Sequence, residues 1–178
     1  IHQNESESET IKISGLICRD FNIEPSRQMS NQNIQEYFEN HQLVGISGID
    51  TRSLVKKIRS KGAMNGIISS EELNLELLKA RLKDVPSMEG LELASKVSTT
   101  STYTIGNEDA SLRVAVLDFG VKKHILQYLA ERGCYLKVFP GKTSLAEMKE
   151  FKPHGYFMSN GPGDPAAMDY AVTTAKAI

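Results

Sequence analysis

The sequence has 178 residues, and its 21 Lys and Arg against 22 Asp and Glu give a formal net charge of −1. With 40% hydrophobic and 24% charged residues, its composition is typical of an ordinary globular chain of one or two small domains. This charge balance excludes the strong field that attracts nucleic acid or an anionic membrane, and no run approaches the roughly 18 apolar residues of a membrane span.

The cysteines predict the cellular compartment, and the two ends of the sequence predict whether it is part of a longer protein. Cys18 and Cys134 cannot build a disulfide framework, and no N-terminal stretch has the form of a signal peptide, so we expect a reducing cytoplasm. The sequence opens at Ile1, before an acidic and polar loop at residues 4–10, and stops at Ile178 inside an apolar pattern. We therefore expect an internal piece of a longer protein.

The first elements along the chain are short. Residues 11–18 alternate well enough to predict a strand, with Gly15 as a bulge or a point of close approach. Residues 31–40 predict a helix that Ser30 could cap, and residues 43–49 predict a second strand.

Two further helices are predicted before residue 90. Asp50 stands where an N-cap belongs and Gly62 where a helix stops, so the stretch between them predicts a helix. Its basic side chains between Arg52 and Lys61 are expected to form a solvated face, with a partner-facing role as the alternative. Residues 71–82 predict another helix. Its inward leucines would be Leu73, Leu77 and Leu78.

A change of composition predicts the domain organisation. Residues 97–111 are rich in Ser, Thr and Gly and show little periodicity, which is typical of a domain boundary. We therefore expect an N-terminal domain at residues 1–100, a linker at 101–111 and a second domain at 112–178.

The second domain has a strand–helix alternation. Strands are predicted at residues 113–120, 134–140 and 155–159, and helices at 121–133, 144–152 and 169–178. This pattern predicts an α/β fold with a doubly wound parallel sheet that is covered on both faces, and three strands should leave one sheet edge uncovered. Ligands bind at the carboxyl ends of such strands, where the loops DFGVKK and NGPGDP follow.

The loop NGPGDP is the most unusual stretch of the sequence. Pro162 and Pro165 restrict the backbone, and Gly161 and Gly163 leave free amides without a side chain in the way. Amides held in fixed positions can stabilise a developing oxyanion. From these residues alone, a tight strand-to-helix connection without any chemistry is the simpler interpretation.

Other chemistries find less support in the sequence. No phosphate-binding glycine pattern is present, and the triplet Asp118-Phe119-Gly120 has no H-R-D catalytic loop before it. Cys18 lies within a predicted strand and Cys134 begins one, so both are expected to be small buried hydrophobic side chains. The four histidines are isolated, so we expect neither a metal nor a cofactor in this chain.

Two stretches together resemble a known family. GISGIDTRSLVKKIRSKGAMNGII is similar to the signature of the N-terminal domain of carbamoyl phosphate synthetase small subunits. VAVLDFGVKKHIL, followed by FMSNGPGDP and DYA, resembles the opening of the class I glutamine amidotransferase domain in the same subunits. SGLICRDF and LELASKVSTT also fit, so the resemblance spans essentially the whole chain. One departure is His124, where the family usually has Asn.

The resemblance implies a fold and an activity. It implies a small N-terminal α/β domain followed by the first units of an amidotransferase domain, truncated here. In the family, a cysteine on a G-I-C-L-G-H-Q elbow attacks the glutamine carboxamide, assisted by His and Glu of an H-P-E segment. Neither segment occurs in this sequence, so the triad is expected beyond Ile178 and the chain alone should lack glutaminase activity.

The resemblance also implies partners. Ammonia would pass through a tunnel to a large synthetase subunit, which uses ATP and bicarbonate to make carbamoyl phosphate for arginine and pyrimidine synthesis. The expected assembly is a heterodimer with glutamine as the substrate, without nucleic acid or membrane.

Only a few residues carry a role over from the family. Gly161 would supply one oxyanion-hole amide, and Gly161 and Gly163 would contact glutamine. Asp50, Thr51 and Arg52 match the N-terminal signature, and we assign them structural roles as a helix cap, a first turn and a local ion pair.

Three alternatives remain open from the sequence. The chain could be an inactive fragment for docking or ammonia channelling, or part of another class I glutamine amidotransferase. It could also be a flavodoxin-like module that binds an anion at the DFGVKK loop, near Lys122.

Overall fold

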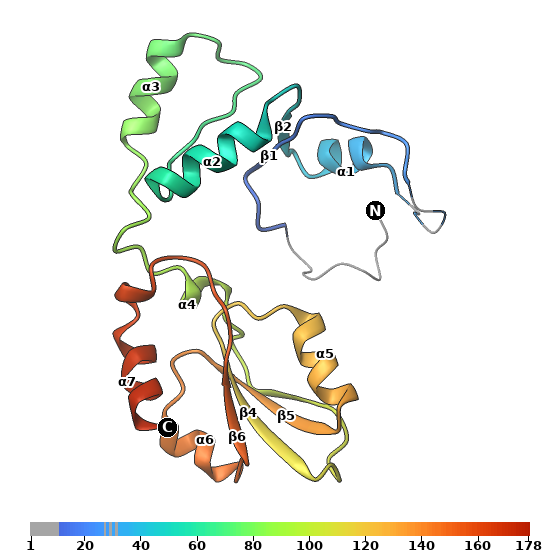
Figure 1. Cartoon of the computed structure of the whole chain (residues 1–178), viewed down its shortest axis with the longest axis vertical. Coiled ribbons are helices and arrows are strands. Elements are labelled where there is room, and N and C mark those ends of the chain that lie inside the picture. Colours follow the sequence, from blue (N-terminus) through green and yellow to red (C-terminus); the bar gives the residue numbers. More distant parts are fainter. Residues whose placement is uncertain (1–10, 27, 29, 31) are drawn as a thin grey trace. The chain divides into compact units, whose positions relative to one another are not determined.

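The computed structural model describes residues 11–26, 28, 30 and 32–178, which fall into two compact units (Figure 1). The first unit is Ile1–Ser87 and the second is Met88–Ile178. The predicted loop at residues 4–10 lies outside the described residues. Within the described part of the chain, none of the helices is long and apolar enough to cross a membrane.

The first unit contains a small parallel sheet. Strand β1 (Gly15–Ile17) pairs in parallel with β2 (Val44–Ile46), and helix α1 (Ile34–Asn40) connects them. Both predicted strands are confirmed, although each is shorter than its predicted range. Helices α2 (Thr51–Lys61) and α3 (Leu75–Lys83) follow.

Helix α1 begins later than predicted. Its N-cap is Asn33, whose Oδ1 accepts a hydrogen bond from the Gln35 N–H at 2.7 Å. The predicted cap at Ser30 is therefore wrong, and the Ser30 hydroxyl donates to the carbonyl of Gln32 instead. Asn33 takes the role because a cap must lie directly before the first helical residue, Ile34.

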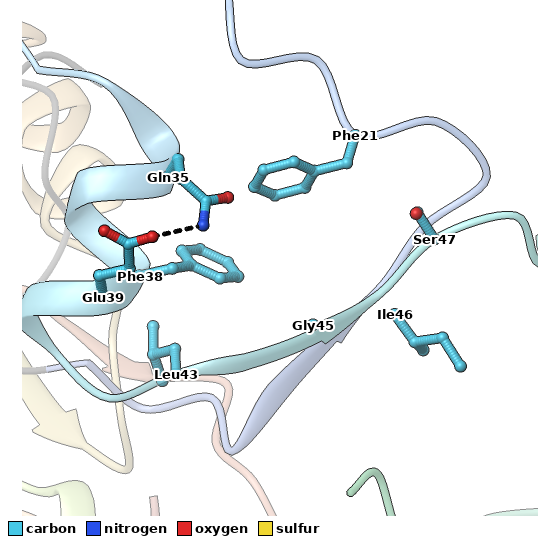
Figure 2. A pocket seen from close by; sticks show the side chains of 8 residues that line it. All are labelled: Phe21, Gln35, Phe38, Glu39, Leu43, Gly45, Ile46 and Ser47. Carbon is cyan, nitrogen blue, oxygen red and sulfur yellow. Dashed lines mark hydrogen bonds between the residues drawn. The ribbon is translucent and has the colours of Figure 1, made fainter. Parts of the chain in front are cut away.

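An aromatic pair lies beside α1 in the first unit. Figure 2 shows Phe38 of α1 and Phe21 at one hollow, with their ring centroids 5.8 Å apart in an edge-to-face arrangement. Gln35 donates to Glu39 at 2.7 Å at the rim of this hollow, which measures about 230 Å³. Such a volume is below the usual range for a small-molecule site.

Helix α2 has the predicted ends. Asp50 Oδ1 accepts a hydrogen bond from the Ser53 N–H at 3.0 Å, and Gly62 ends the helix with φ of 83°. The cap and the stop are both confirmed, because each depends only on neighbouring residues.

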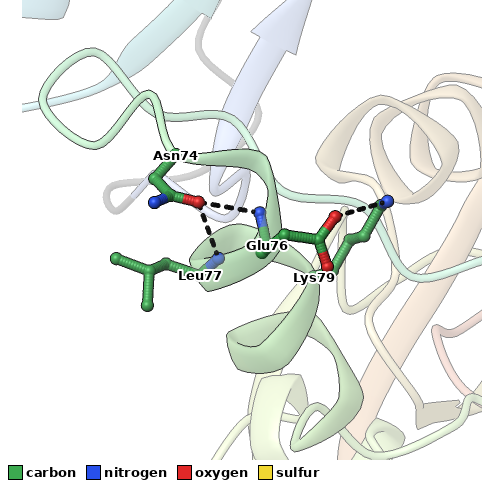
Figure 3. Close-up of polar contacts among 4 residues, drawn as sticks. All are labelled: Asn74, Glu76, Leu77 and Lys79. Atoms are coloured by element: carbon green, nitrogen blue, oxygen red, sulfur yellow. Dashed lines mark hydrogen bonds and ion pairs between the residues drawn. The ribbon is translucent and has the colours of Figure 1, made fainter.

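Helix α3 differs from its prediction in both its start and its buried face. Asn74 caps it, accepting from the N–H groups of Glu76 (3.0 Å) and Leu77 (3.3 Å) (Figure 3). Leu73 precedes this cap and is 81% exposed, and Leu77 is 50% exposed, so their predicted inward placement is wrong. The half-buried positions on this helix are Leu78 and Leu82, four residues apart, so the sheltered face is rotated away from Leu77.

The second unit is built on a four-stranded sheet with the order β3-β5-β4-β6. Strands β4, β5 and β6 are parallel, as predicted, and β3 pairs antiparallel with β5, so the sheet is mixed. The strands are β3 (Tyr103–Ile105), β4 (Leu112–Asp118), β5 (Cys134–Pro140) and β6 (Gly155–Met158). Among the described residues, β6 pairs with β4 only, which leaves its other edge open.

Helices cover both faces of this sheet (Figure 1). The helices are α4 (Ala94–Val97), α5 (Lys123–Glu131), α6 (Leu145–Glu150) and α7 (Asp169–Ala177). Val116 of β4 belongs to the apolar cluster under α5, and its neighbour Leu117 belongs to the cluster that α4, α6 and α7 complete. Successive strand residues point to opposite faces, so one strand supplies both cores. The predicted α/β fold, with a sheet covered on both faces, is confirmed.

The division between the units lies earlier than the predicted linker at 101–111. Strand β3 falls inside that range, with Tyr103 opposite Val138 of β5. A side chain at Gly106 would place its Cβ 2.4 Å from the Cys134 carbonyl oxygen, so this glycine permits close backbone packing. Residues 88–111 therefore belong to the second unit. The strand within them is not evident from the local sequence, because its hydrogen-bond partners lie on β5.

Candidate functional site

The loops that follow β4 and β6 meet at the carboxyl edge of the sheet. The Ser159 N–H donates to the Leu117 carbonyl at 3.1 Å, and the Ser159 hydroxyl accepts from the Phe119 N–H at 2.8 Å. The same hydroxyl donates to the Asn160 carbonyl at 2.8 Å. Ser159 thus anchors the start of the NGPGDP loop to the end of β4.

Gly161 lies directly against the backbone of β4. A Cβ at this position would be 2.2 Å from the Phe119 carbonyl oxygen, so no other residue fits without moving the loop. Gly161 is exposed, and its N–H donates no hydrogen bond to any described residue. An amide that is held in place and has no partner among the described residues suits the predicted oxyanion role, which stays a prediction.

Gly163 is constrained by a different neighbour. Its φ is 94°, and a Cβ there would be 2.6 Å from the Leu91 carbonyl oxygen. The predicted contact of Gly163 with glutamine likewise stays a prediction. The residues that crowd Gly163 come from a segment to which sequence reasoning gave no role.

That segment comprises residues 90–99 and runs along the carboxyl edge of the sheet; we call it the edge segment. Its Gly90 N–H donates to Asp164 Oδ2 at 2.8 Å, after β6, and its Thr99 N–H donates to Asp118 Oδ2 at 2.7 Å, after β4. Its Ser98 hydroxyl accepts from the Gly141 N–H at 2.9 Å, after β5. The edge segment therefore contacts the end of each parallel strand.

Asp118 acts as a local anion at the turn after β4. It is buried, and its Oδ1 accepts from the N–H groups of Gly120 and Val121, both at 2.8 Å. These amides are the ones that an anionic ligand would use at the DFGVKK loop. Because Asp118 already occupies them, the structure weighs against the anion-binding alternative at this loop.

A second acid, Glu92, connects the edge segment to α7. It accepts hydrogen bonds from the Ser95 N–H (2.8 Å), the Ser95 hydroxyl and the Tyr170 hydroxyl (2.9 Å). The bonds from the side chain and then the N–H of Ser95 hold the pKa of Glu92 below its usual value. Burial, followed by the hydrogen bond to Glu92, raises the pKa of Tyr170 to about 12.

Of the two cysteines, only Cys134 belongs to the second unit; Cys18 and the N-terminal signature belong to the first. Cys134 is buried at the start of β5, as predicted, and Cys18 is half-buried directly after β1; both are free thiols. No group of three or more His, Cys, Asp and Glu in the described part of the chain could hold a metal. The predicted ion pair of Arg52 is wrong, because Arg52 forms no ion pair with any described residue; Glu76 and Lys79 form one on α3. Arg52 is exposed on the first turn of α2, where Thr51 is the first helical residue.

The parallel sheet and the glycine-rich loop at its carboxyl edge define the class of the second unit. Residues 115–178 match the family model of class I glutamine amidotransferases. Residues 1–68 match the model of the carbamoyl-phosphate synthase small chain, CPSase domain. The chain thus matches the two domains of a carbamoyl phosphate synthase small chain in order, which confirms the resemblance and the fold class.

Curated relatives agree over the whole chain. Carbamoyl phosphate synthase small chains from Synechocystis sp. and Nostoc sp. are 39% and 40% identical to it, and each match covers 100% of this chain and 50% of the relative. The small chain of Salmonella typhimurium is 37% identical, covering 97% of this chain and 49% of the relative. The chain thus spans about half the length of the curated relatives it matches.

Proposed function

We propose that this chain forms part of the glutamine-hydrolysing small chain of a carbamoyl phosphate synthase. The two family-model matches support the proposal, since they place a synthase small-chain domain and an amidotransferase domain in one polypeptide. The observation that carries it is the placement of Gly161 at the carboxyl edge of the sheet, pressed onto the backbone of Phe119.

The chemistry follows from this placement. When a nucleophile attacks the glutamine carboxamide, negative charge develops on the carboxamide oxygen, and a fixed N–H donor stabilises it. The Gly161 N–H can serve because the loop is already held to β4 through Ser159 and does not need to reorganise. Gly163 would contact the substrate beside it. The cysteine nucleophile and its histidine and glutamate are proposed to come from sequence other than these 178 residues.

The assembly is also part of the proposal. The small chain would pair with a large synthetase chain that uses ATP, and ammonia from glutamine would pass to it for carbamoyl phosphate synthesis. Arginine and pyrimidine synthesis would consume the product. A reducing cytoplasm suits the two free thiols, Cys18 and Cys134.

The experiment compares two nitrogen sources in the full-length protein purified with its large synthetase chain. We expect carbamoyl phosphate synthesis with either glutamine or ammonia, and loss of only the glutamine-dependent rate when the large chain is assayed alone. If the small chain adds no glutamine-dependent synthesis, it is a docking chain and the proposal fails. Glutamine hydrolysis at full rate without any partner would overturn the proposed assembly.

A further inference from the structure

We propose that Asp164 is a positioning residue for the glutamine site, because it ties the loop that carries Gly161 and Gly163 to the edge segment. The inference rests on the proposed function and extends it to a residue that does not touch the substrate. The two ends of the NGPGDP loop are held in different ways.

The first end of the loop is fixed through Ser159, whose hydroxyl and N–H both bond to the end of β4. The second end has no such link to β4 or β6. Asp164 ties it to the edge segment instead: its N–H donates to the Leu91 carbonyl at 2.9 Å, and its Oδ2 accepts from the Gly90 N–H at 2.8 Å. Gly161 lies between these two anchors, so its position depends on both.

The contact between the loop and the edge segment is made backbone to backbone. Glu92 faces Gly163 in an antiparallel bridge, and the Leu91 carbonyl oxygen leaves no room for a Cβ on Gly163. With no side chains between the two backbones, a shift of one is passed directly to the other. The edge segment is itself held to α7 through the hydrogen bond from Tyr170 to Glu92.

The carboxylate of Asp164 suits this role better than an amide would. Its Oδ2 accepts from the edge segment, and its Oδ1 accepts from the Ala166 N–H at 2.9 Å, at the turn that leads into α7. Asparagine offers a single acceptor oxygen and could keep only one of these bonds. Both carboxylate oxygens are engaged with backbone N–H groups, so Asp164 acts through the loop and not on the substrate.

The test uses Asp164→Ala and Asp164→Asn in the full-length protein assembled with its large synthetase chain. Asp109→Ala is the matched control, since Asp109 is an exposed acid of the same unit whose carboxylate accepts no hydrogen bond from the described residues. We expect Asp164→Ala to lower the glutamine-dependent kcat about tenfold to a hundredfold, because it displaces an oxyanion donor whose complete loss costs about 10²–10³. The ammonia-dependent rate should stay at the wild-type level, and kcat should fall by a larger factor than KM rises.

Asp164→Asn should fall between the wild type and Asp164→Ala, and Asp109→Ala should match the wild type. Equal losses with glutamine and ammonia would show that Asp164 maintains the fold, and would overturn the inference. So would wild-type glutamine-dependent kinetics in Asp164→Ala. Thermal unfolding of each variant shows whether it is folded. If Asp164→Ala does not fold, the ratio of the glutamine-dependent to the ammonia-dependent rate in Asp164→Asn decides instead. Failure of the proposed function can be told apart from failure of this inference, because in that case the wild type itself would show no glutamine-dependent synthesis.

Discussion

Adding a single methyl group at Gly161 should lower the rate of carbamoyl phosphate synthesis from glutamine but not the rate from ammonia. In Gly161→Ala the Cβ would lie 2.2 Å from the Phe119 carbonyl oxygen. The shortest ordinary carbon–oxygen contact is about 3.3 Å, so the loop must move away from β4 by about 1 Å. A misplacement of about 1 Å at a catalytic group typically costs about a hundredfold in rate, or about 2.7 kcal/mol of transition-state stabilisation.

The assay is steady-state carbamoyl phosphate synthesis by the full-length assembly, with glutamine or with ammonia. Gly155→Ala is the matched control, because a Cβ on this glycine of β6 meets nothing within 4 Å. We expect Gly161→Ala to lower glutamine-dependent kcat/KM about a hundredfold while the ammonia-dependent rate survives. Gly161→Pro also removes the N–H and should cost at least as much. Gly163→Ala cannot serve as a steric control, because its Cβ would lie 2.6 Å from the Leu91 carbonyl oxygen.

Two outcomes would refute this reasoning. If Gly161→Ala behaves like Gly155→Ala, the position of the loop does not govern glutamine use. If Gly161→Ala lowers both rates equally, the loop supports the fold or the subunit interface instead of an oxyanion.

Three further predictions concern the stability and chemistry of the second unit. Asp118→Ala should lower its free energy of unfolding by about 3 kcal/mol, because three backbone N–H groups lose their charged acceptor; an unchanged urea midpoint would contradict this. Cys134→Ala should leave glutamine-dependent synthesis within about twofold of the wild type, because its thiol is buried in β5, and complete loss would make Cys134 the nucleophile after all. The folded-state pKa of Tyr170 is about 12, whereas in the unfolded chain the tyrosine releases its proton near its ordinary pKa of 10.0. Stability should therefore fall as the pH rises between these two values. Tyr170→Phe should flatten that fall in a series of alkaline unfolding curves, and an identical pH dependence would refute the assignment.

Sequence reasoning succeeded where neighbouring residues decide the structure. The cap at Asp50 and the stop at Gly62 depend on hydrogen bonds and backbone angles within a few positions, and both are observed. The alternation of strands and helices after residue 112 depends on periodicity, so it also placed the NGPGDP loop at the correct edge of the sheet. The prediction at Ser30 failed because several polar residues in that stretch could cap a helix.

Sequence reasoning failed where distant residues decide the structure. Strand β3 falls in the range predicted as a linker, because its hydrogen bonds come from β5, about 30 residues later in the chain. The edge segment was missed for the same reason, since the bond from Gly90 to Asp164 joins residues 74 positions apart. The one available signal was that LELASKVSTT fits the family, and this did not reveal which groups it contacts.

The path of the edge segment has a practical consequence for dissecting the protein by limited proteolysis or by expression of separate halves. A cut within residues 106–111 would remove both the edge segment and β3 from the amidotransferase half. Asp118 would then lose the Thr99 N–H, and Asp164 would lose the Gly90 N–H. A cut at the junction between Ser87 and Met88 keeps all of these groups in one piece. Gentle digestion should therefore nick the chain near that junction well before it reaches the Ser- and Thr-rich stretch, despite the more flexible composition of the latter.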